Sequence, residues 1–118
     1  MQRIKSYKTF ESQSDDQKEI VGLTTEQISF LDENAPEKWS LNSEAGLVDV
    51  DGDFDCYRQE LTDFKGVRFG RVNDFDCSDN QLRSLEGAPQ SVGGGFWCYN
   101  NELKSLEGAP QSVGGVFW

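Results

Sequence analysis

The sequence predicts an α/β-type repeat solenoid, with a parallel β ladder and little helix, capped N-terminally by a helix and a β-hairpin. Two observations predict the ladder. The segment SLEGAPQSVGG occurs twice, at residues 84–94 and 105–115, and the three cysteines lie 21 residues apart, at Cys56, Cys77 and Cys98. A period of this length is typical of structural repeats that bury their apolar side only by stacking.

Three units align at this period, and each contains the pattern of a short strand. The units span residues 52–72, 73–93 and 94–114, and a fourth begins at residue 115. A Phe-x-Cys pattern in each unit puts two apolar side chains on one side of a strand, because successive side chains point to opposite faces. The residues expected to face the core are Phe54, Cys56, Phe75, Cys77, Phe96 and Cys98.

An asparagine follows the strand in the second and third units, at Asn80 and Asn101, and a leucine follows two residues later. An amide side chain at such a bend bonds backbone groups that the turn leaves unpaired. With these residues the region 52–118 resembles the leucine-rich repeats of bacterial and bacteriophage proteins, and it is similar to the short repeats of bacterial effectors. The resemblance implies a binding scaffold and no particular activity. The first unit departs from the pattern at Gln59 and Arg68, which replace Asn and Pro, as expected of an end-capping unit.

The segment 47–60, LVDVDGDFDCYRQE, supports two interpretations. Carboxylates at the first, third and fifth positions from Asp49, with Glu60 at the twelfth, match the spacing of a calcium-binding EF-hand loop. The same segment alternates like a strand. Phe54 stands at the sixth position, where an EF-hand needs glycine for its sharp turn, and it shares the core position of the repeat. We therefore predict a strand, with no metal site and no cofactor; incidental cation binding by the carboxylates is the remaining alternative.

Residues 1–46 lack the repeat and are expected to cover the N-terminal end of the ladder. The segment TTEQISFLDEN predicts a helix over about residues 24–34, with Thr24 as N-cap and Gln27 completing a capping box. The segment KWSLNSEAGLVDV predicts a hairpin with its turn at Gly46. Together these two elements form the predicted cap.

Three smaller expectations complete the domain assignment. Trp39 is expected to fill the core of the cap rather than bind a partner. The start of the chain is polar and is expected to be mobile, although Ile4, Tyr7 and Phe10 would share one face of a helix; its opening residues resemble leader segments of some phage head-packaged proteins. Residues 47–118 are expected to hold about three coils and the strand stub of a fourth.

The side chains between the core positions are expected to line one exposed face of the ladder, which is acidic in the first two units and aromatic in the third. This face contains no Lys or Arg. Tryptophan and tyrosine are enriched at binding hot spots, so we expect a protein partner of basic or mixed charge. A solvated acidic surface and a divalent-cation site are the alternatives. The predicted partner-binding residues are Asp53, Asp55, Tyr57, Asp74, Asp76, Trp97 and Tyr99, and the same face includes Ser78 and Gly95.

Composition limits the function classes. The chain has 21 acidic and 11 basic residues, a net charge of −10, and no histidine. Such a surface repels phosphate, so direct nucleic-acid binding is not expected. Without histidine, and with its cysteines in the core, the chain is not expected to be an enzyme. The absence of a long apolar run or secretory signal indicates no membrane contact and a cytoplasmic protein, in the host cytoplasm if it is phage-encoded.

These observations favour a phage-related protein-interaction module that binds its partner through the strand surface. Two alternatives are an acidic inhibitor that imitates nucleic acid and a self-associating structural subunit. The fourth unit contains only GVFW, which leaves an unpaired sheet edge beside Phe117 and Trp118. Such an edge invites pairing, so we expect a two-fold homodimer through these residues unless the chain is a fragment of a longer array.

Overall fold

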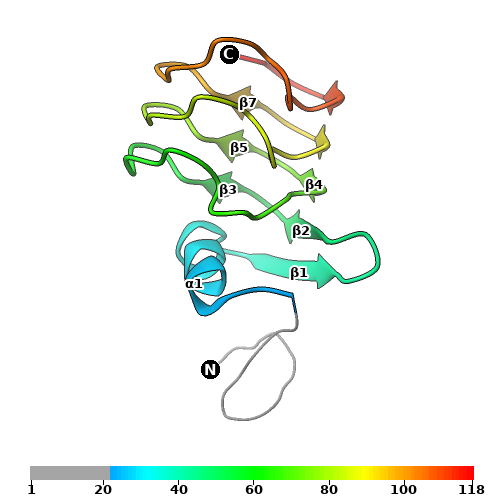
Figure 1. Cartoon of the computed structure of the whole chain (residues 1–118). Helices are drawn as coiled ribbons and strands as arrows, with labels where there is room; N and C mark the ends of the chain where they lie inside the picture. The colour runs from blue at the N-terminus through cyan, green and yellow to red at the C-terminus, as the bar shows by residue number, and fades with distance from the viewer. Residues whose placement is uncertain (1–21) are drawn as a thin grey trace.

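The computed structural model describes residues 22–118. The predicted mobile start and its Ile4, Tyr7 and Phe10 therefore lie outside the described residues. In Figure 1 a helix and a hairpin lie at one end, and successive turns of the chain lie side by side from there toward the C terminus. This part of the chain is a small α/β structure with one helix, one antiparallel strand pair and two parallel sheets, none of which closes into a barrel.

Helix α1 (Thr25–Asn34) begins at the predicted capping box. The backbone N–H of Gln27 donates to Oγ1 of Thr24 (3.1 Å), and Oε1 of Gln27 accepts from the backbone N–H of Thr24 (2.8 Å). Two N–H groups at the helix start, which have no partner within the helix, are satisfied in this way. The helix buries Phe30 and Leu31 against the core.

The predicted hairpin consists of β1 (Lys38–Asn42) and β2 (Leu47–Asp51), which pair antiparallel. Gly46 lies in the turn with a φ of +73°, a conformation that glycine adopts without steric cost. Trp39 packs against the core but is only half-buried, and its indole Nε1 donates to Oδ1 of Asp32 (2.8 Å). Trp39 therefore lies at the border of the core, because its polar N–H needs an exposed partner.

The first parallel sheet consists of β3 (Phe54–Asp55), β5 (Phe75–Asp76) and β7 (Phe96–Trp97). Adjacent strands pair residues that are 21 apart in the sequence, in agreement with the period of the repeat. An isolated bridge between Phe96 and Phe117 extends the pairing by one further segment. This sheet carries both the phenylalanine positions of the core and the predicted binding residues.

The second parallel sheet consists of β4 (Arg71–Val72), β6 (Ser91–Val92) and β8 (Ser112–Val113). Strands β6 and β8 pair residues that are 21 apart, but β4 and β6 pair residues that are 20 apart, as from 71 to 91. The constant 21-residue alignment is therefore wrong by one residue here. Phe69, which is buried, takes the place of the repeat proline, and Arg68, which the alignment put there, is exposed.

The strand predicted across residues 47–60 is interrupted. Strand β2 ends at Asp51 and β3 begins at Phe54, and between them Gly52 has a φ of +136°, which side-chain-bearing residues rarely adopt. The chain passes there from the hairpin to the first parallel sheet. The predicted facing is nevertheless confirmed, since the core includes Val48, Val50, Phe54 and Cys56.

The core is a column of aromatic rings beside a column of thiols. The rings of Phe54 and Phe75 stack at 5.5 Å between centroids, and those of Phe75 and Phe96 stack at 5.6 Å. Each ring is fully buried, and the burial of each contributes about 1.5–3 kcal/mol to the stability of the fold. The three cysteines are buried and form no disulfide. The inward positions predicted from the Phe-x-Cys pattern are therefore confirmed.

Candidate functional site

The outer surface of the first sheet, hereafter the strand face, collects the side chains that the sequence predicts there. Parallel register sets equivalent residues of neighbouring strands side by side, about 4.8 Å apart. One row runs from Asp55 through Asp76 to Trp97. The strand face comprises Asp53, Asp55, Tyr57, Asp74, Asp76, Ser78, Gly95, Trp97 and Tyr99.

The first row of carboxylates bonds to the backbone of the next unit. Oδ1 of Asp53 accepts from Nδ2 of Asn73 (2.9 Å) and from the backbone N–H of Asp74 (3.1 Å). Oδ1 of Asp74 accepts in turn from the backbone N–H of Gly95 (2.8 Å). These aspartates therefore join successive units, because each lies beside a backbone N–H at the start of the next strand.

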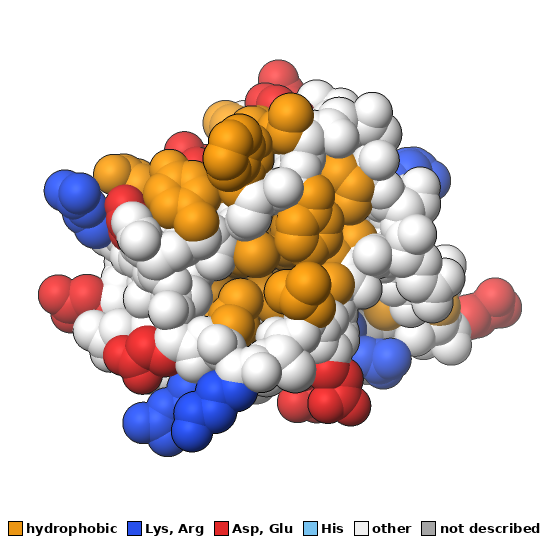
Figure 2. All heavy atoms as spheres, turned by 90° about the horizontal axis from the view of Figure 1, so that it is seen from above, with side chains coloured by type: hydrophobic (Ala, Val, Ile, Leu, Met, Phe, Trp, Pro, Cys, Tyr) orange, Lys and Arg blue, Asp and Glu red, His pale blue; other side chains and the backbone are white. Residues whose placement is uncertain are grey.

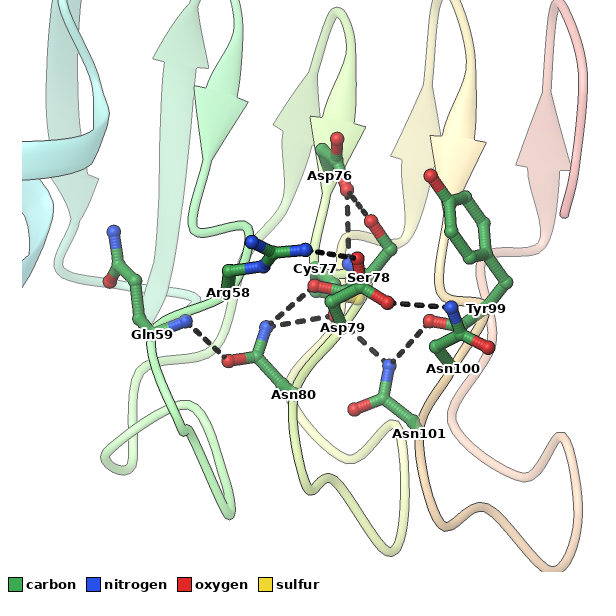
Figure 3. Close-up of polar contacts among 10 residues, drawn as sticks. All are labelled: Arg58, Gln59, Asp76, Cys77, Ser78, Asp79, Asn80, Tyr99, Asn100 and Asn101. Carbon is green, nitrogen blue, oxygen red and sulfur yellow. Dashed lines mark hydrogen bonds and ion pairs between the residues drawn. The ribbon is translucent and has the colours of Figure 1, made fainter.

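The second row of carboxylates closes turns within its own unit. Oδ1 of Asp55 accepts from the backbone N–H of Tyr57 (3.0 Å). Oδ1 of Asp76 accepts from both the backbone N–H (3.0 Å) and the hydroxyl (2.6 Å) of Ser78 (Figure 3). Ser78 lies on the same side of the sheet as Asp76, as predicted, and its hydroxyl bonds Asp76, but Ser78 is buried rather than exposed.

Three aromatic side chains of the strand face reach solvent. Tyr57 is 39% exposed and Tyr99 is 45% exposed, and Trp97 is half-buried. The indole of Trp97 lies against Gly95, since a β-carbon at position 95 would collide with the indole ring. Gly95 was predicted to be an exposed position, but it is the buried floor beneath this ring.

Asn80 fixes the backbone just beyond the strand face. Its Oδ1 accepts from the backbone N–H groups of Gln59 and Leu61 (2.9 Å each), and its Nδ2 lies 3.0–3.1 Å from three backbone carbonyl oxygens. Figure 3 shows the bonds of Asn80 with Gln59, Cys77 and Ser78. Asn80 is buried, and four of these five bonds are buried with it, so the amide satisfies backbone groups that water does not reach. Asn101 repeats the arrangement one unit later. The predicted role of the repeat asparagines is confirmed.

The row of amides continues into helix α1. Gln59 holds the asparagine position of the first unit, and its Nε2 donates to Oδ1 of Asn34 (2.7 Å). Nδ2 of Asn34 lies 3.3 Å from Oε1 of Gln59 and donates to the carbonyl of Phe30 (3.0 Å). The sequence did not predict this role for Asn34; its position three residues after Leu31, on the side of the helix that carries the apolar residues, was its only signal.

A further row of polar side chains, which was also not predicted from the sequence, borders the strand face. Arg58, Asp79 and Asn100 all adopt positive φ, from 53° to 56°. Nδ2 of Asn100 donates to Oδ1 of Asp79 (2.6 Å), and Nη2 of Arg58 lies 4.0 Å from Oδ2 of Asp79 (Figure 3). The guanidinium of Arg58 also lies 5.3 Å from the ring centroid of Tyr57. Asp and Asn are the side chains that best tolerate this backbone conformation, which is the signal in the sequence.

The three thiols are unsuited to nucleophilic chemistry. Burial raises the pKa of Cys56, Cys77 and Cys98 above the ordinary value. The nearby carboxylates of Asp55 and Asp76 raise the pKa of Cys56 further. A thiol with a raised pKa stays protonated at neutral pH and is a weak nucleophile and metal ligand.

An apolar surface lies at the end of the molecule nearest the C terminus. Figure 2 shows this end, with hydrophobic side chains gathered in its centre. Leu106 is 59% exposed and Trp118 is 64% exposed, whereas Leu85, at the position of Leu106 in the preceding unit, is fully buried. Phe117 packs on Phe96 and is 41% exposed. Self-association through Phe117 and Trp118 stays a prediction.

The chain was compared with protein-family models, curated proteins and solved structures, and none of them matches it. Among residues 22–118, no three Asp, Glu or Cys side chains come together as a metal site requires, and the prediction for calcium stays untested. The same residues include no helix long and apolar enough to span a bilayer.

Proposed function

We propose that this chain is a small leucine-rich-repeat solenoid and a non-enzymatic protein-interaction module that binds a protein partner through the strand face. The 21-residue register of the first sheet, the stacked phenylalanines and the bonds of Asn80 and Asn101 support the solenoid. The observation that carries the binding function is the solvent-accessible pair Trp97 and Tyr99 on one strand face. Aromatic side chains of this kind dominate the energetics of protein interfaces.

The support beneath these aromatic residues favours binding over incidental exposure. Gly95 forms a floor for the indole of Trp97. The side-chain amide of Asn101 both accepts and donates hydrogen bonds, and these bonds close the bend that follows Tyr99. A side chain held in place before binding loses less conformational entropy when a partner docks. The strand face is therefore suited to a preorganised contact.

The chemistry of the strand face supports a binding role rather than catalysis. Asp53, Asp74 and Asp76 each use one oxygen to hold backbone N–H groups, and the buried thiols are protonated. The chain contains no histidine that could act as a general base. Reduced cysteines suit a cytoplasmic site of action, in the host cytoplasm if the protein is phage-encoded.

Alanine substitutions on the strand face test this proposal. We expect Trp97→Ala and Tyr99→Ala to preserve the circular dichroism spectrum and to weaken the capture of a bacterial lysate protein by more than about 1 kcal/mol, or about 5-fold. Gln90→Ala is the matched control, because Gln90 is exposed beside β6 in the second sheet. The proposal fails if a captured protein binds both aromatic variants as tightly as the wild-type chain.

A second candidate function is an acidic inhibitor that occupies a nucleic-acid-binding groove. It is favoured by the net charge of −10 and by the pairing of Asp55 with Asp76 across adjacent strands. The two candidates differ in their response to salt. An imitation of nucleic acid should lose affinity steeply as salt rises, whereas an interface anchored by Trp97 and Tyr99 should lose little.

A further inference from the structure

We infer that Trp97, Asp74 and Asp76 form a receptor for an arginine side chain of the protein partner. This inference rests on the proposed function and names the chemistry that the strand face recognises. It combines an aromatic surface with two carboxylates that each have one oxygen free.

The two carboxylates are oriented by their own bonds. Oδ1 of Asp74 is engaged by the backbone of Gly95, and Oδ1 of Asp76 is engaged by Ser78. Within residues 22–118, the Oδ2 atoms of Asp74 and Asp76 form no hydrogen bond or ion pair. Both side chains are partly exposed. Each therefore keeps one fixed oxygen and presents the other as an acceptor.

The indole lies directly beside these acceptors. Trp97 is the register partner of Asp76, and its ring lies over Gly95, whose backbone bonds Asp74. Trp97 is partly exposed, so part of its indole remains available to a ligand. Tryptophan is the strongest aromatic partner for a cation. Because Asp76 and Trp97 occupy paired positions on adjacent strands, a guanidinium stacked on this indole can donate to Oδ2 of Asp76.

The protein already contains one contact of this kind. The guanidinium of Arg58 lies 5.3 Å from the centroid of Tyr57 and 4.0 Å from Oδ2 of Asp79, which belongs to the next unit. Among the described residues, the cation–π contacts involve only Tyr57 and Phe30, so the indole of Trp97 holds no cation of this part of the chain. A partner's arginine would make at Trp97 the contact that Arg58 makes at Tyr57.

The geometry favours arginine over lysine. A guanidinium is planar, so it stacks on an indole while its edge donates to a carboxylate, whereas an ammonium is a compact point charge. None of the residues that make up the strand face is Lys or Arg, and Arg58, which lies over Tyr57, is paired with Asp79. The net charge of −10 also attracts basic segments over longer distances.

A titration followed by nuclear magnetic resonance tests the inference on the full chain. The probe is the peptide acetyl-Gly-Arg-Gly-amide, added at constant ionic strength, and the readout is the indole N–H signal of each tryptophan. We expect a saturable shift at Trp97 and none at Trp39 or Trp118. The citrulline peptide, which has the same shape without the charge, should cause no shift, and the lysine peptide should bind more weakly.

Two variants of equal charge locate the carboxylate. Asp76→Asn keeps an acceptor for Ser78 and removes the charge beside Trp97, and we expect it to weaken arginine binding by at least about 5-fold. Asp55→Asn removes the same charge from the same row, one strand farther away, and should weaken binding by less than about 2-fold. An equal effect of the two variants would overturn the assignment.

The remaining outcomes separate this inference from the proposed function. The absence of an indole shift, or an equal shift with citrulline or lysine, overturns the arginine receptor. If a captured protein still depends on Trp97 in that case, the strand face binds partners by other chemistry and the proposed function survives. If capture does not depend on Trp97 or Tyr99, the proposed function fails as well.

Discussion

At the scale of single residues, Asn80 makes more hydrogen bonds than any other polar side chain described above. One buried amide serves two N–H donors and three carbonyl acceptors of the backbone. We expect Asn80→Ala to lower the free energy of unfolding by about 3 kcal/mol, because it leaves several buried backbone groups unpaired. Urea unfolding monitored by circular dichroism measures the loss.

Asn101→Ala is the matched control for this prediction. Asn101 occupies the same repeat position, but it is only partly buried and accepts from a single N–H, that of Leu82. Its removal should therefore cost less than the removal of Asn80. A loss below about 1 kcal/mol for Asn80→Ala would contradict the stabilising role of the Asn80 hydrogen bonds, as would an equal loss for both variants.

The thiols predict how stability depends on pH. Burial raises the pKa of all three thiols, whereas a thiol in the unfolded chain titrates near about 8.5. Above that pH, the unfolded chain releases protons that the folded protein keeps, so the free energy of unfolding falls as pH rises. The contribution is fully present below about pH 8, and each thiol accounts for a loss of up to about 1.4 kcal/mol per pH unit above that range.

Urea unfolding with reductant present, at about pH 7.5 and about pH 9.5, checks this slope. Cys77→Ala should make it shallower, because one of the three buried thiols is gone. A free energy of unfolding that does not change over this pH range would show that the thiols titrate normally and are accessible to solvent.

At the scale of secondary-structure elements, strand β7 and its glycine determine where the indole lies. Gly95→Ala should displace the ring of Trp97, because the new methyl group occupies the space of the indole. We expect the indole N–H signal to move and partner capture to weaken nearly as much as in Trp97→Ala. Gly93→Ala is the control, since Gly93 is exposed and an added methyl group there meets only Asn73. Unchanged capture by Gly95→Ala would mean that indole placement is unimportant.

Elements with a strong local signal were predictable from the sequence. The capping box of α1 and the inward Phe54, Phe75 and Phe96 follow from spacing alone. Turn chemistry was equally informative at Gly46, where the hairpin needs a positive φ. These features depend on residues close in sequence or on the repeated unit itself, so one sequence was sufficient.

Features set by contacts between units were not predictable. The break at Gly52 occurs because β2 and β3 join different sheets, and the one-residue shift before β4 accommodates the buried ring of Phe69. For the candidate site, alternation placed Trp97 and Tyr99 on the exposed face, but it also placed Ser78 there. Ser78 does share that side with Asp76 and bonds it, but Ser78 is buried, because alternation gives the direction of a side chain and not its exposure.

At the scale of the whole molecule, one continuous set of amide and backbone bonds supports the strand face. It begins in α1 at Asn34, passes through Gln59 to Asn80, and repeats at Asn101. The strand face lies beside this set of bonds for its whole length. We therefore expect a partner to dock on a surface that changes little on binding, as in other preorganised interfaces.

Site-specific photo-crosslinking most directly tests whether the strand face binds the partner. A benzophenone amino acid replaces Tyr99 on the strand face in one sample and Gln90 beside β6 in another, and each sample is irradiated in a lysate from which the wild-type chain captures a protein. We expect a covalent adduct with the captured protein from position 99 and none from position 90. An adduct from position 90 without one from position 99 would place the contact on the other sheet and contradict the proposed function.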